Sequence, residues 1–214
     1  MLRHNLLFMV SCLATLSGQC QANWQLAKEQ EGIRVFLKNA EGSGIKMMRV
    51  ECEVAAKQEA VLALLLDIPA SEKWIPQTKT WYYLRRPSVT ECYYYSELRL
   101  PWPVSNRDYV VHLKAWQQPA TKVVTVDANV LAGEVPEKEG IVRVQVSTVK
   151  WVLYPTQNGH TRLFYQLFTD PGGSLPTSIV NYFAKQAAFD IVKKMRELVQ
   201  QPPYRDASLP FSSK

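Results

Sequence analysis

The sequence predicts an α+β domain in which a curved antiparallel sheet of about nine strands is covered by one long C-terminal helix. Between residues 24 and 170 most segments alternate apolar and polar side chains, a period typical of half-buried strands. A single short helical stretch interrupts this series. From Ile179 to Val199 apolar residues recur at three- and four-residue steps, which indicates an amphipathic helix. Such a helix is expected to bury its apolar stripe against the sheet.

Three strands are predicted at the start of the domain. Glu31 and Gly32 form the first turn, and the glycine-containing segment 41–44 forms the second. In the third strand Met48 and Val50 alternate with charged neighbours, so one face is expected to be buried. The predicted strands are 24–28, 33–38 and 45–54.

Short helices are predicted after the third strand. Ala60, Val61, Leu64 and Leu65 share one helical face, and Pro69 ends the run. Residues 71–76 are expected to add one further turn.

Six more strands are predicted before the long helix, separated by turn-forming residues. In the segment 141–154 the apolar phase changes, because Val142 and Val144 have one parity and Trp151 has the other. One extra residue near 147–148 would return them to one face, so a β-bulge is predicted there. The predicted strands are 81–86, 92–100, 108–116, 122–130, 141–154 and 161–168.

The first 22 residues are predicted to be a signal peptide that is removed. A basic lead precedes an apolar run, 6–16, that is too short to span a bilayer, and cleavage is expected after Ala22. A lipoprotein signal fits less well, because Gln19 rather than a small residue precedes Cys20. The protein is therefore expected to be periplasmic or secreted.

The mature chain is predicted to comprise one domain, 23–200, and a flexible tail, 201–214. Loss of the leader lowers the formal charge from +6 to +5, because the leader holds one arginine and no acid. This modest positive balance favours anionic surfaces such as lipid headgroups. Basic residues form no run of five or more, so no nucleic-acid partner is predicted. Cys52 and Cys92 are predicted to be free, buried thiols, and the chain is expected to be a monomer.

The mature sequence has no recognisable catalytic or metal-binding motif, so we predict no metal, no cofactor and no enzymatic activity. His112 and His160 are far apart and lack nearby acidic or cysteine clusters. Asp108 and His112 share a strand face and could form an acid–base pair. The simpler interpretation is a solvent-facing histidine and an aspartate held by a neighbouring arginine. Arg107 is expected to form a local ion pair with Asp108 or, alternatively, to meet a lipid phosphate or carboxylate.

Six short motifs are spread over nearly the whole mature chain, from residue 24 to about residue 200. They are Trp24, Gly32-Ile33-x-Val35, Leu66-Asp67 followed by Trp74, Pro101-Trp102-Pro103 with Arg107-Asp108, Trp151-x-Leu153-x-Pro155, and Pro171-Gly172-Gly173-x-Leu175-Pro176. In this order they resemble the START (StAR-related lipid-transfer) domain family, particularly its small secreted bacterial members. The resemblance implies a helix-grip fold that encloses a hydrophobic tunnel for a lipid. It also implies that the start of the helix and a neighbouring loop act as a lid.

The apolar parity of the strands selects the residues expected to face that tunnel. The interior is mostly apolar, with a phenol and a hydroxyl as possible donors, which leaves the lipid's identity open. Trp102 is expected either to pack in the core or to anchor the loop at a bilayer. The residues predicted to bind the ligand, in the tunnel or the lid, are Tyr94, Ser96, Leu98, Trp102, Arg107, Val111, Leu113, Tyr165, Ile179, Phe183 and Ala187.

The predicted function is the binding and transfer of a lipid or other hydrophobic ligand. The C-terminal helix and the 101–106 loop would gate the tunnel, and a membrane surface would be a transient partner. Two alternatives remain open at this point. One is an enzyme of the polyketide cyclase type on the same scaffold, and the other is an envelope interaction module without a ligand.

Overall fold

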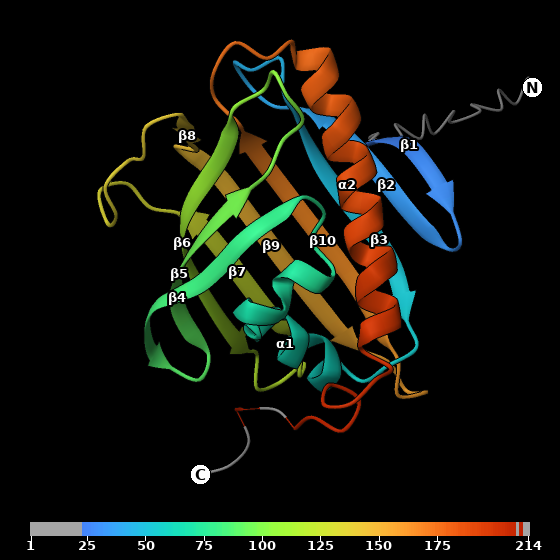
Figure 1. Ribbon diagram of the computed structural model, residues 1–214. Helices are drawn as coiled ribbons and strands as arrows, with labels where there is room; N and C mark the ends of the chain where they lie inside the picture. The colour runs from blue at the N-terminus through green and yellow to red at the C-terminus, as the bar shows by residue number, and fades with distance from the viewer. Residues whose placement is uncertain (1–22, 209, 212–214) are drawn as a thin grey trace, which may run out of the picture.

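The computed structural model describes residues 23–208 and 210–211, so the predicted signal peptide lies outside the described part. Ten strands form one sheet in the order β1-β2-β3-β10-β9-β7-β6-β5-β4, with β8 beside β6 (Figure 1). The elements are β1 (Gln25–Gln30), β2 (Ile33–Asn39), β3 (Lys46–Val54), α1 (Gln58–Leu66), the 3₁₀ helix η1 (Ile68–Lys73), β4 (Thr78–Ser88), β5 (Glu91–Leu98), β6 (Asn106–Gln117), β7 (Val124–Val130), β8 (Ile141–Arg143), β9 (Val146–Pro155), β10 (Thr161–Asp170) and α2 (Thr177–Leu198).

The long helix α2 lies across the face of the curved sheet, and α1 lies near one end of it (Figure 1). All neighbouring strands on the main path are antiparallel. This arrangement confirms the predicted α+β helix-grip fold. The Pro171–Pro176 segment ends β10 and positions the start of α2, because proline cannot continue a strand ladder.

The core lies between the sheet and the apolar stripe of α2. Met48 and Val50 of β3 are buried, as their alternation predicts, and so are Val192 and Met195 of α2. Each fully buried side chain of this size contributes about 1.5–3 kcal/mol relative to exposure. The predicted free thiols of Cys52 and Cys92 are also buried, and burial raises the pKa of each to about 11.

The predicted bulge near residues 147–148 is wrong. The segment forms two strands, and β8 pairs in parallel with the start of β6 while β9 lies between β10 and β7. Between them Val144 is buried, and its N–H donates to the Asp108 carbonyl at 3.0 Å. The apolar phase changes because the chain leaves β6 and then pairs with β10 and β7. In the sequence alone, this change of partner resembles a bulge.

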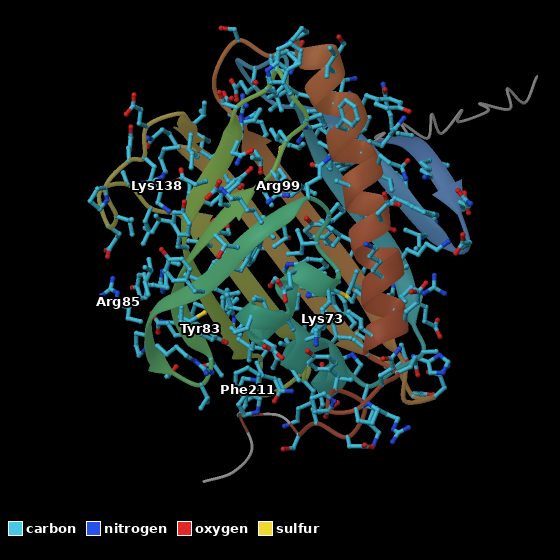
Figure 2. The ribbon with its side chains drawn as sticks, in the orientation of Figure 1. Lys73, Tyr83, Arg85, Arg99, Lys138 and Phe211 are labelled. Carbon is cyan, nitrogen blue, oxygen red and sulfur yellow. The ribbon has the colours of Figure 1, made fainter. Side chains whose placement is uncertain are left out.

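The packed part of the chain extends beyond the predicted domain boundary at residue 200. Tyr204 is buried, and its hydroxyl donates to Asp67 Oδ2 at 2.8 Å. Asp67 Oδ1 also accepts from the Ala70 N–H and so caps η1. Figure 2 shows Tyr83 and Phe211 at this same end of the domain, where the Tyr83 hydroxyl donates to the Leu66 carbonyl at 2.7 Å.

Candidate functional site

A cavity of about 490 Å³ lies between the inner face of the sheet and α2. Its volume falls within the range of about 300–1,000 Å³ that is usual for small-molecule sites. All the residues that the sequence analysis selected lie on its walls or at its mouth: Tyr94, Ser96, Leu98, Trp102, Arg107, Val111, Leu113, Tyr165, Ile179, Phe183 and Ala187. Their contact with a ligand stays a prediction.

Strands β5 and β6 form one wall. Tyr94 pairs with Val111 and Ser96 with Tyr109, so these four side chains lie on the same face of the sheet and point toward the cavity. Tyr109 also faces the cavity and was not predicted, although it has the same parity as Val111. That parity was sufficient to identify it.

Aromatic rings cover much of the cavity wall. Trp81 stacks on Tyr94 with ring centroids 5.1 Å apart, and Trp151 stacks on Tyr165 at 3.7 Å. Trp74 meets Trp151 edge to face at 6.3 Å. The three tryptophans line the cavity but were not selected from the sequence. Trp74 and Trp151 belong to the family motifs, which could have identified them. Nothing in the sequence places Trp81 beside Tyr94.

Three phenols face the cavity from different strands of the sheet: Tyr94 from β5, Tyr109 from β6 and Tyr165 from β10. Burial raises the pKa of all three, and that of Tyr109 to about 12. The side-chain hydrogen bonds of the described residues include none to these phenols. The raised pKa keeps each phenol protonated. Because the described side chains form no hydrogen bond with them, the three hydroxyls can still bond to a ligand.

Arg107 is the one charged side chain among the described residues that line the cavity. It is only 3% exposed, and desolvation lowers its pKa. Its guanidinium donates to the carbonyls of Ser105 (2.6 Å), Pro171 (3.2 Å) and Gly172 (3.0 Å). Arg107 thus ties the loop before β6 to the segment before α2.

The predicted ion pair between Arg107 and Asp108 is wrong, because adjacent strand residues point to opposite faces. Asp108 lies on the outer face, where Arg143 donates to Oδ1 (2.7 Å) and Oδ2 (3.0 Å). Asp108 and His112 share the outer face, as predicted, but they do not form the acid–base pair. His112 Nε2 lies 2.7 Å from Glu91 Oε1, so the histidine and Asp108 have separate partners.

The mouth of the cavity carries an exposed apolar group, the mouth patch, formed by Trp102, Ile179, Tyr182 and Phe183. Trp102 is 93% exposed, which contradicts a core-packing role. Figure 1 shows the loop after β5, the turn between β2 and β3 and the segment before α2 gathered around the start of α2.

No helix in residues 23–208 and 210–211 is long and apolar enough to cross a membrane. Within that same part of the chain, no three His, Cys, Asp or Glu side chains gather as metal ligands.

Comparison with known proteins agrees with this architecture. The START domain family model matches residues 13–205. The chain is similar to a solved STAR-related lipid transfer protein from Xanthomonas axonopodis, with 32% identity, a TM-score of 0.77 and coverage of 83% of this chain and 99% of the other. It is 31% identical to the Pseudomonas aeruginosa protein PA1579 over 84% of this chain and 88% of that relative.

A more distant relative is named for an activity. The phosphatidylcholine transfer protein of Mus musculus is 26% identical, over 84% of this chain and 85% of the relative. The family match spans most of the chain, and the sheet, the covering helix and the enclosed cavity agree with it. This protein therefore belongs to the START domain family.

Proposed function

We propose that this protein binds one lipid in the cavity beneath α2 and carries it between membranes. The observation that carries the proposal is the cavity itself, whose lining combines apolar and aromatic side chains with a single charged residue, Arg107. Transfer of an acyl chain from water into such surroundings contributes about 0.8 kcal/mol per CH₂ group. The lipid-transfer activity named for the mouse relative supports the same assignment.

The proposed lid consists of the start of α2 and the 101–106 loop. Both contribute residues to the lining of the cavity, and Arg107 connects the 101–106 loop to the segment that precedes α2 through backbone carbonyls. At the other side of the helix, Asn181 Nδ2 donates to the Gly44 carbonyl at 3.0 Å, which anchors α2 to the β2–β3 turn. Opening would require these hydrogen bonds to break together.

The proposed membrane contact is the mouth patch. Tryptophan and tyrosine favour the headgroup region of a bilayer, where the ring is shielded and its polar edge stays hydrated. The Lys185 ammonium lies 5.7 Å from the Tyr182 ring, so a cation accompanies the aromatic side chains. An anionic membrane surface suits this combination.

The proposed site of action is the periplasm or the exterior of the cell. The N-terminal sequence pattern, with expected cleavage after Ala22, supports this proposal. We further propose that the mature chain acts as a monomer.

Leu113→Asp is expected to abolish lipid uptake. Leu113 is buried at the cavity wall, and a carboxylate there would make the site unfavourable for an acyl chain. Transfer of a fluorescent lipid between liposomes measures the effect. Trp116→Asp is the matched control, because Trp116 lies on the outer face of the same strand and is exposed. Normal transfer by a folded Leu113→Asp variant would contradict the proposed site.

Trp102→Ala is expected to weaken binding to anionic vesicles about tenfold or more. Burial of a tryptophan removes roughly 150–250 Å² from water, and even partial insertion stabilises the bound state substantially. Cosedimentation with phosphatidylglycerol vesicles measures the affinity, and Trp116→Ala is the control. Equal vesicle binding by Trp102→Ala and the unaltered protein would exclude this loop as the membrane contact.

A further inference from the structure

The interior of the cavity contains a polar cluster formed by the phenols of Tyr94, Tyr109 and Tyr165. Tyr94 and Tyr165 are more than nine-tenths buried, and all three residues line the cavity. They are close enough that each phenolate would disfavour ionisation of a neighbour. No side-chain hydrogen bond joins these hydroxyls to any residue in the described ranges. The hydroxyls open onto the cavity, and the indole N–H groups of Trp74 and Trp81 in the same lining are buried without a partner, so a ligand oxygen in the cavity would complete these donors.

The charges around the cluster define the kind of ligand atom. The lining residues within the described chain include no aspartate, glutamate, lysine or histidine. A bare carboxylate or ammonium at the cluster would be desolvated without a counter-ion. Arg107 lies at the lid, where three backbone carbonyls already accept from its guanidinium. The cluster is therefore suited to an uncharged oxygen.

Ring stacking reduces the number of aromatic faces that a quaternary ammonium group could meet at this position. Such a cation is held by the open faces of several aromatic rings. Here Trp151 and Tyr165 stack at 3.7 Å with planes 5° apart, and Trp81 stacks on Tyr94 with planes 18° apart. Each stacked pair covers one face of both of its members. The hydroxyl groups at the ring edges remain available, and these donate to oxygen.

We infer that the three phenols bind the uncharged oxygen-bearing end of an otherwise apolar molecule, such as an ester carbonyl or an alcohol. This inference rests on the proposed lipid-binding function and specifies its ligand class. The phenols act as donors from three strands of the sheet, and their raised pKa values keep them protonated across the physiological range. The apolar remainder of the ligand fills the space beside Val111 and Leu113.

The test compares four probes that differ at one end. Methyl dodecanoate, pentadecane, dodecanoate and dodecyltrimethylammonium each compete with the neutral fluorophore N-phenyl-1-naphthylamine for the purified protein. Methyl dodecanoate is expected to bind about tenfold more tightly than either ion, and pentadecane, which has as many non-hydrogen atoms, is the apolar reference. Tyr94→Phe and Tyr165→Phe are each expected to reduce the ester's affinity about two- to tenfold and to leave pentadecane unchanged.

Tyr154→Phe is the matched control, because Tyr154 carries an exposed phenol on β9 and does not line the cavity. A loss of pentadecane affinity in Tyr94→Phe and Tyr165→Phe that equals the loss for the ester overturns the inference. Tightest binding of either ion overturns it too, as does an ester affinity that both phenylalanine variants retain. If none of the probes displaces the fluorophore or binds, the proposed lipid-binding function fails as well.

Discussion

Arg143→Ala is expected to lower the free energy of unfolding by about 3–5 kcal/mol, because it leaves a buried carboxylate without its cation. The side chains of Arg143 and Asp108 are 3% and 1% exposed, and two hydrogen bonds join them. In the variant, Asp108 would keep only the Tyr95 hydroxyl, at 3.1 Å, as a side-chain donor. Urea unfolding followed by circular dichroism measures the loss. The melting temperature is expected to fall by about 10 °C.

Arg85→Ala is the matched control for that substitution. Arg85 projects from the outer side of the molecule and pairs with Glu134 at 3.1 Å, with both side chains substantially exposed (Figure 2). Exposed pairs contribute only about 0–1 kcal/mol, since water solvates both charges once they separate. Equal stability losses for the two variants would show that the buried pair has no special structural role. Lipid binding by the folded Arg143→Ala protein is expected to persist, because Arg143 does not line the cavity.

The fold was largely predictable because period-two alternation and the helical stripe of α2 are local patterns. Met48 and Val50 show the alternation within one strand, and Val192 and Met195 show the stripe within one helix. The parallel pairing of β8 with β6 was not predictable in this way. It joins residues about 35 positions apart, so its hydrogen bonds leave no trace in the local pattern.

The candidate site was likewise predictable where it depends on a local pattern and unpredictable where it depends on contacts between distant residues. Parity correctly oriented Tyr94 and Val111 toward the cavity, because it depends only on the strand's own geometry. It could not find the partner of Asp108, which comes from another strand. Sequence proximity favoured Arg107, yet adjacent strand residues face opposite sides and the two side chains diverge. Trp81 was missed for a related reason, since its ring reaches the cavity by stacking on a neighbouring strand.

Arg107→Ala is expected to speed the loss of bound lipid about tenfold or more. Its guanidinium joins the Ser105 carbonyl to those of Pro171 and Gly172, so it holds the two segments of the proposed lid together. Hydrogen bonds from a charged group contribute about 1.5–3 kcal/mol each, and loss of 1.4 kcal/mol already corresponds to a tenfold change in rate. Dilution of the lipid-loaded protein into acceptor vesicles measures the release rate. Arg162→Ala is the control, because Arg162 is an exposed arginine outside the cavity lining.

Gly173→Ala tests the same connection without removing the arginine. Gly173 has a φ of +73°, and an added Cβ would lie 3.1 Å from Arg107 Nη2. The left-handed conformation costs a residue with a Cβ about 1–2 kcal/mol, and the contact would displace the guanidinium from the Gly172 carbonyl. Faster lipid release is therefore expected from Gly173→Ala as well. Arg107→Lys should resemble Arg107→Ala, because an ammonium lacks the planar fork that reaches three carbonyls. If both arginine variants release lipid at the unaltered rate, Arg107 fixes the loops without controlling the opening of the cavity.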